Sequence, residues 1–141
     1  PGEDGAISAM TINSLVSVSL DPMLVSWSLQ NSASQFAAYS GAERFTISIL
    51  AQSQQALARR YAARGDSALL HEDFETGADG LPAIRGALGH IACRRFAVHG
   101  AGDHTIILGE VTGMAQAPRP DGAADHPLVF FGGRFGALGD Q

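Results

Sequence analysis

The first third of the chain carries many side chains that can donate hydrogen bonds without bearing a charge. These side chains belong to Thr11, Asn13, Ser14, Ser17, Ser19, Ser26, Ser28, Ser32 and Ser34. Ser26 and Ser28 need no ligand to explain them, because serine is common on the exposed face of a strand. Ser32 and Ser34 lie where a helix is expected to begin, and hydroxyls beside the amide hydrogens of a helix start can bind a phosphate group without lysine. A phosphate-bearing cofactor is therefore one interpretation of this segment.

A second candidate is the pair Asp103 and His104, which follows Gly100, Ala101 and Gly102 where a hairpin is expected to enter a strand. A side chain at this rim position can reach a ligand. On spacing alone, a turn aspartate beside a solvated histidine explains the same two residues. The 5 histidines form no His-x-His or His-x-x-x-His pair, so the sequence predicts no metal site.

Other chemistries are excluded by what the sequence lacks. All 9 basic residues are arginine, which excludes a lysine Schiff base or a P-loop lysine. The segment from Gly100 to Thr105 begins like a dinucleotide fingerprint, but its third glycine is missing and a β-type run follows, so a hairpin turn is expected instead. No Gly-x-Ser-x-Gly elbow occurs. Cys93 is the single cysteine and lies in an apolar run, which predicts a small buried residue and no internal disulfide.

Length and composition bound the class of protein. The 141 residues are 45% hydrophobic and 16% charged with a net charge of −5, which predicts a single folded domain over residues 1–141. A pI of about 5.4 without a basic stripe argues against a nucleic-acid partner. No stretch approaches the roughly 18 apolar residues of a membrane span, and the start does not resemble a signal peptide, so a cytoplasmic location is expected.

Alternating apolar and polar residues predict short strands along most of the chain. The expected strands are 6–13, 15–20, 24–29, 44–50, 88–98, 104–111 and 128–131. In the second of these, alternation places Val16, Val18 and Leu20 on one side and Ser17 and Ser19 on the other.

Two short helices complete the expected elements. Residues 32–35 have the spacing of a capping box, which predicts a helix from there to about Ser40, with Gly41 just past its end. Ser53 is expected to cap a second helix over 54–64, and residues 66–82 are expected to form a long loop. Six or so strands with two short helices predict a small antiparallel barrel.

Several motifs, taken in order, resemble the flavin reductase-like family of short-chain, FMN-binding split-barrel proteins. These motifs are Thr11-Ile12-Asn13-Ser14, Ser17-Val18-Ser19-Leu20-Asp21-Pro22, Arg44-Phe45-Thr46-Ile47-Ser48-Ile49-Leu50, Ala58-Arg59-Arg60-Tyr61, Gly102-Asp103-His104-Thr105 with Gly109-Glu110-Val111, and Phe131-Gly132-Gly133-Arg134-Phe135. The resemblance implies a mainly β fold, a split β-barrel with Greek-key-like connections and two or three short helices. It also implies that the family's first strand precedes Pro1.

The resemblance further implies a homodimer that binds FMN or FAD and uses NADH or NADPH. Its site residues carry over by position. Thr11, Asn13 and Ser14 would lie along the isoalloxazine and ribityl chain, with Ser17 and Ser19 lining the same loop; Ser32 and Ser34 would hold the flavin phosphate; His104, with Asp103, would orient the nicotinamide; and Phe135, where the family often has tyrosine, would keep only ring stacking.

Together these implications predict an NAD(P)H-dependent flavin reductase. The nicotinamide would stack on the isoalloxazine and pass a hydride to it, and the reduced flavin would supply a partner monooxygenase. The same barrel could instead be a flavin-binding electron carrier without NAD(P)H turnover, or a flavoenzyme that reduces a dedicated substrate. The sequence leaves open the choice of FMN or FAD and of NADH or NADPH.

Overall fold

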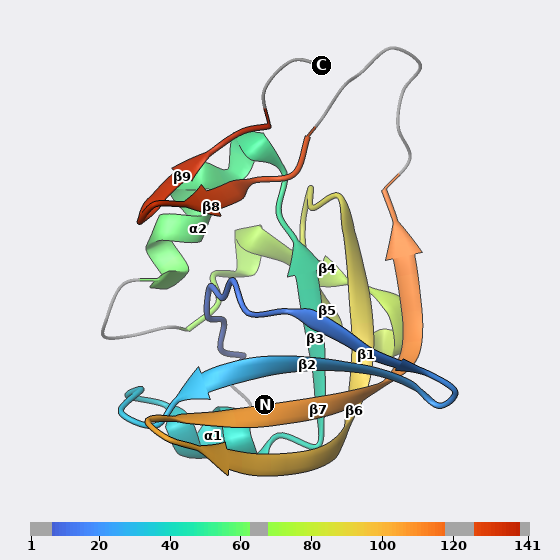
Figure 1. Ribbon diagram of the computed structural model, residues 1–141. Coiled ribbons are helices and arrows are strands. Elements are labelled where there is room, and N and C mark those ends of the chain that lie inside the picture. The colour runs from blue at the N-terminus through green and yellow to red at the C-terminus, as the bar shows by residue number, and fades with distance from the viewer. Residues whose placement is uncertain (1–6, 63–67, 118–125, 139–141) are drawn as a thin grey trace.

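The computed structural model describes residues 7–62, 68–117 and 126–138. Its main feature is a five-stranded antiparallel sheet in the order β1-β2-β7-β6-β3, so that β1 and β3 are the edges (Figure 1). The strands of this sheet are β1 Val16–Leu20, β2 Met23–Gln30, β3 Arg44–Ile49, β6 Gly89–Ala101 and β7 His104–Gln116. The sheet is strongly curved but its two edges do not pair with each other within the described residues.

Smaller elements surround the sheet. Two short antiparallel pairs are β4 Phe74–Thr76 with β5 Pro82–Ile84, and β8 Val129–Phe131 with β9 Arg134–Gly136. The helices are α1 Phe36–Gly41 and α2 Gln55–Ala62, with 3-10 turns at Gln52–Gln54, His71–Asp73 and Ala78–Gly80. Figure 1 shows the β8–β9 hairpin beside α2, at the opposite end of the molecule from α1.

The core lies on the concave face of the sheet and follows from the alternation in β2. Alternation in the sequence predicts that Val25, Trp27 and Leu29 face opposite to Leu24, Ser26 and Ser28. The first three residues point inward from β2, and Leu29 is completely buried. They pack with Ile47 of β3, Cys93 of β6 and Ile107 of β7. The prediction that Cys93 is a buried apolar residue is confirmed, and burial raises the pKa of its thiol to about 11.

The strand expected over 6–13 is wrong for the residues that the structure describes. Residues 7–13 form only an isolated bridge between Ser8 and Ala68. Thr11 bonds to the helix instead: its amide donates to the carbonyl of Tyr61 at 3.1 Å and its hydroxyl to the carbonyl of Ala58 at 2.6 Å. The segment is extended because it runs along α2, and not because it pairs with a strand.

The capping box expected at 32–35 is also wrong. The helix begins at Phe36, its N-cap is Gln35, and no side chain caps it. Residues 30–36 form two successive turns, in which Ala33 donates to the carbonyl of Gln30 and Phe36 to that of Ala33. Gly41 is the last residue of the helix rather than the residue after it.

Other expected boundaries also change. The second helix is confirmed over 55–62, but Ser53 lies inside the 3-10 turn that precedes it. That turn begins with a bond in which the Gln54 side chain accepts from the amide of Ala51 at 2.9 Å. The expected loop 66–82 contains β4, and its end pairs back as β5. The expected closing strand 128–131 pairs with β9 instead of closing the main sheet. The proline, glycine and aspartate residues of segments 1–5 and 119–127 also predict a turn and a loop, and residues 1–5 and 119–125 lie outside the described residues.

Candidate functional site

Two polar segments meet where β2 ends and β7 begins. Gln30, the last residue of β2, pairs with His104, the first of β7. The two segments stay paired beyond the strand ends, because the backbone amide of Asn31 donates to the carbonyl of Asp103 at 2.9 Å. We call residues 30–34 and 102–105 the turn cluster. It brings the predicted phosphate-binding serines beside the predicted nicotinamide-binding histidine.

The side chain of Asn31 adds two bonds inside the turn cluster. Its Nδ2 donates to the carbonyl of Gly102 at 3.2 Å, and its Oδ1 accepts from the hydroxyl of Thr105 at 2.7 Å. Thr105 is the buried polar residue of the described chain, with an exposed fraction of 7%. Gly102 has φ +65, a left-handed conformation that lets the hairpin turn tightly.

Ser32 and Ser34 are both exposed within the turn cluster. Within the part of the chain that the structure describes, their hydroxyls make no hydrogen bond to protein. They are therefore free to donate to a ligand. Helix α1 begins after both serines and has only 6 residues, so the exposed donor groups at this position are hydroxyls rather than a helix terminus.

His104 and Asp103 form a side-chain pair on the same turn. Nδ1 of His104 lies 2.7 Å from Oδ1 of Asp103. The hydrogen bond from His104, and then its charge, hold the pKa of Asp103 below its ordinary value. An ionised Asp103 can only accept, so Nδ1 of His104 carries the hydrogen and Nε2 is left for a ligand.

The predicted ring-binding segment approaches β2 just before the turn cluster. Ser14 lies against Ser28, whose amide donates to the Ser14 hydroxyl at 2.9 Å. Asn13 is exposed beside it. The hydroxyl of Thr11 is already used on the carbonyl of Ala58, so Asn13 is the residue of this segment best placed to meet a ligand.

Ser17 and Ser19 lie elsewhere. A bulge at Val18 shifts the register of β1, so that Ser17 pairs with Val25 and Ser19 with Leu24. Since Val25 and Leu24 are neighbours on one strand, the two serines face opposite sides, and the predicted alternation of β1 is wrong beyond Ser17. Val25 is five residues from Gln30, so Ser17 is roughly 17 Å along the strand from the turn cluster.

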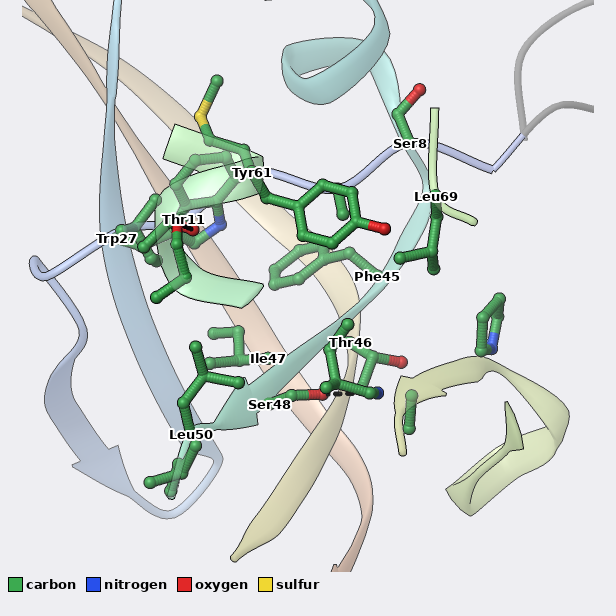
Figure 2. A pocket seen from close by; sticks show the side chains of 18 of the residues that line it. Ser8, Thr11, Trp27, Phe45, Thr46, Ile47, Ser48, Leu50, Tyr61 and Leu69 are labelled. Carbon is green, nitrogen blue, oxygen red and sulfur yellow. Dashed lines mark hydrogen bonds between the residues drawn. The ribbon is translucent and has the colours of Figure 1, made fainter. Parts of the chain in front are cut away.

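A cavity of about 860 Å³ lies between the concave face of the sheet and α2. Figure 2 shows the rings of Trp27, Phe45 and Tyr61 around it. Trp27 and Thr46 each keep one buried polar atom, Nε1 and Oγ1, with no partner among the described residues. Three of the predicted site residues line this cavity, namely Thr11, Asn13 and Phe135.

Tyr61 joins the cavity wall to the loop that follows α2. Its hydroxyl donates to Asp73 at 2.6 Å and accepts from the amide of Leu70 at 3.0 Å. Arg60 pairs with the same carboxylate at 2.8 Å. Burial, and then the bond to Asp73, raise the pKa of Tyr61, so Tyr61 is a neutral structural hydroxyl.

Phe135 lies on β9, and not at the turn cluster. Its ring contacts that of Phe130, 5.3 Å between centroids, and the guanidinium of Arg59 on α2 lies 6.0 Å from its centroid. In Figure 1 this hairpin and the β6–β7 turn are at different ends of the molecule. Within one protomer, therefore, Phe135 lies away from the turn cluster that holds His104.

Sequence reasoning missed Asn31 and Thr105. An asparagine after a strand indicates a turn, but its partners are about 70 residues away and depend on the pairing of β2 with β7. The described residues contain no group of three or more His, Cys, Asp or Glu side chains that could hold a metal ion. In the same part of the chain, no helix has both the length and the apolar character needed to cross a membrane.

A family model described as the flavin reductase like domain matches residues 2–139 of this sequence. The chain belongs to the flavin reductase-like family. The resemblance seen in the sequence motifs is thereby confirmed, and the mainly β fold with few short helices agrees with solved flavin reductases.

Individual members of the flavin reductase-like family are similar along most of the chain. FMN reductase (NADH) SmoA of Agrobacterium fabrum is 46% identical over 132 residues, which cover 94% of this chain and 72% of that protein. NADH:FAD oxidoreductase SgcE6 of Streptomyces globisporus, solved with NAD and FAD fragments, has a TM-score of 0.81 at 34% identity, covering 92% of this chain and 76% of that one. The styrene monooxygenase flavin reductase of Pseudomonas putida has a TM-score of 0.84 at 29% identity, covering 99% and 86%.

Proposed function

We propose that this chain is an NADH-dependent flavin reductase. Membership of the flavin reductase-like family supports the reaction class, and the relatives named above as NADH-dependent support the choice of NADH. The observation that carries the proposal to particular residues is the turn cluster, in which Asn31, the residue before Ser32, makes hydrogen bonds to Gly102, Asp103 and Thr105, the residues around His104.

The residues present fit a flavin phosphate. Ser32 and Ser34 offer two exposed hydroxyl donors that no described protein group occupies. No lysine is needed, because hydroxyl and amide donors can carry a phosphate, as they do in many nucleotide sites. Ser14 lies at the level of Ser28, about 7 Å along the strand from the end of β2 at Gln30, where the turn to Ser32 begins. Asn13 and Ser14 would contact the ring and the ribityl chain.

His104 is the residue proposed to meet the nicotinamide nucleotide. Asp103 holds Nδ1, which fixes the ring orientation and leaves Nε2 for the ligand. A bound flavin supplies the chemistry, since its ring accepts a hydride from the nicotinamide. The protein residues place the two rings, and donors from the 11–14 segment would stabilise the charge that the reduced ring develops.

The same proposal includes the assembly. β1 is an edge strand whose hairpin with β2 exposes Val18, Leu20 and Met23, which we call the β1–β2 tip. Exposed apolar side chains on a sheet edge fit a protein interface, and we assign this one to a homodimer in which the open sheet forms part of a split barrel. Reduced flavin would serve a partner such as a flavin-dependent monooxygenase, as the similarity to the styrene monooxygenase reductase suggests.

Anaerobic mixing of the purified protein with FMN or FAD, followed by NADH or NADPH, tests the reaction directly. We expect the flavin absorbance to bleach with NADH at a rate that is first order in bound complex. Flavin binding without bleaching would contradict the proposal and indicate an electron carrier. Colour that survives dialysis, together with bleaching only when an added acceptor is present, would indicate a flavoenzyme with a dedicated substrate.

His104→Ala tests the residue assignment. We expect the hydride-transfer rate constant in stopped flow to fall about 10- to 100-fold, the loss that misplaced reactants produce, while the flavin dissociation constant stays within twofold. His71→Ala is the matched control, because His71 is an exposed histidine on a 3-10 turn whose ring contacts Phe74. An unchanged rate in His104→Ala would remove His104 from the site.

A further inference from the structure

The two halves of the proposed site come from distant parts of the sequence and are joined through one side chain. Asn31 and Gly102 are 71 residues apart, and Asn31 and Thr105 are 74 apart. The side-chain amide of Asn31 donates through Nδ2 to Gly102, on one side of the β6–β7 turn, and accepts through Oδ1 from Thr105, on the other side. The turn is thereby held on both sides of His104.

The orientation of the Asn31 side chain is fixed by its partners. The carbonyl of Gly102 can only accept, so it must face Nδ2, and the Thr105 hydroxyl then donates to Oδ1. Thr105 is almost completely buried, so its hydroxyl has no exposed alternative, and an unpaired hydroxyl there would cost free energy. The three residues therefore have one favoured arrangement.

We infer that Asn31 and Thr105 are positioning residues for hydride transfer. Together they fix where His104 lies relative to the Ser32–Ser34 hydroxyls, and so fix the nicotinamide relative to the flavin. The inference rests on the proposed function and adds two residues to which no role has been assigned. Neither residue is required to touch a ligand.

The fold does not depend on this pair of side-chain bonds. The backbone pairing of Gln30 with His104 and the Asn31 amide bond to Asp103 remain when the side chains are shortened. What is lost is the orientation of the turn, and a displacement of the reacting groups by about 1 Å can cost up to 100-fold in rate. The effect should therefore appear in the rate of hydride transfer more than in folding.

Thr105→Val removes the hydroxyl and keeps the shape. We expect the single-turnover hydride-transfer rate constant to fall about tenfold, with the dissociation constants of flavin and NADH changed by less than twofold. Thr105→Ser keeps the hydroxyl and is expected to restore most of the rate. A purely structural role would lower the amount of active protein and leave the rate constant of the folded protein unchanged.

Thr112→Val is the matched control on the same strand. This substitution also removes hydrogen bonds, because the Thr112 hydroxyl donates to Asp79 at 2.9 Å and to the carbonyl of Ala92 at 3.3 Å. Thr112 lies toward the end of β7 that is far from the turn cluster. We expect it to leave hydride transfer unchanged. An equal fall in Thr112→Val and Thr105→Val would show a general effect of weakening β7 and would overturn the inference.

Asn31→Ala provides a second test at an exposed position, where folding is least at risk. We expect the hydride-transfer rate constant to fall as much as in Thr105→Val. The double variant should be little slower than either single variant, because both substitutions remove the same Asn31–Thr105 hydrogen bond. If the wild-type protein reduces flavin, two results would overturn the inference and leave the proposed function standing. One is that the losses in hydride-transfer rate of the two single variants add up in the double variant, and the other is that neither single variant loses rate. A wild-type protein that reduces no flavin would overturn the proposed function itself, and the inference with it.

Discussion

The two ends of the β2–β7 strand pair differ in chemistry although they share a core. At one end the turn cluster gathers exposed serines, an Asp–His pair and the Asn31 bonds. At the other end the β1–β2 tip exposes Leu20, with an exposed fraction of 81%, together with Val18 and Met23. One end offers donors to a small polar ligand, and the other offers apolar area to a protein surface.

The difference shows how one rigid element can support two kinds of recognition. Leu29 and Ile107 lie on neighbouring strands close to the turn cluster and are almost fully buried. Their packing holds β2 and β7 together, so each end can vary without disturbing the other. Function is then decided by which side chains the strand ends expose, while the strands themselves serve only as support.

Removing the shared support should have the largest effect. Leu29→Ala deletes a completely buried side chain, and we expect the free energy of unfolding to fall by about 2–5 kcal/mol in urea denaturation. Leu138→Ala is the control, because Leu138 is 54% exposed and lies outside the β1–β2 tip, and a loss under about 0.5 kcal/mol is expected there. A loss at Leu138 as large as that at Leu29 would contradict the assignment of this support to the buried core.

The β1–β2 tip gives the second test. Leu20→Asp places a charge in the proposed dimer interface, and we expect the dimer dissociation constant in analytical ultracentrifugation to rise at least tenfold. The protomer should keep its stability, because Leu20 is exposed in it. Phe131→Asp is the matched control on the β8–β9 hairpin, where the side chain is 85% exposed. Dissociation caused by Phe131→Asp and not by Leu20→Asp would move the interface to that hairpin.

Much of the fold could be predicted from the sequence because its strands are half-buried. Alternation located β2 and the inward-facing Trp27 and Leu29, and glycine spacing located the β6–β7 turn. The prediction failed where the structure depends on contacts that are distant in the sequence. Residues 7–13 pair with no strand beyond the Ser8–Ala68 bridge, and Thr11 bonds to α2 instead. Strand β1 changes face because of a bulge at Val18 that no local pattern reveals.

The site was predictable only as far as residue types allowed. Ser32, Ser34 and His104 could be proposed from the motifs, and the structure places them in one cluster. Asn31 could not be found, because its importance depends on strand register over about 70 residues. Phe135 and Ser17 show the reverse case, since the resemblance grouped both with the flavin-binding residues and the protomer holds both away from the turn cluster.

The smallest expected effect concerns the Asp–His pair of the turn cluster. The pKa of Asp103 lies below its ordinary value because of His104, so the pair contributes stability above the unfolded pKa of about 4, and this contribution is lost as the pH falls through the lower folded value. Asp103 is largely exposed, with 87% of its side chain accessible, so solvent screens the interaction and the change in stability is small.

The pKa itself is the sharper measurement. His104→Gln should return the pKa of Asp103 toward its ordinary value in a carboxyl-carbon NMR titration. Asp79 is the internal control, because its pKa is lowered by Thr112 and Arg44 at the other end of β7 and should not move. An Asp103 pKa that stays low in His104→Gln would show that the turn backbone holds the carboxylate. In that case Asp103 would not fix the orientation of the His104 ring. The turn cluster would then lack the oriented imidazole that distinguishes it from the β1–β2 tip.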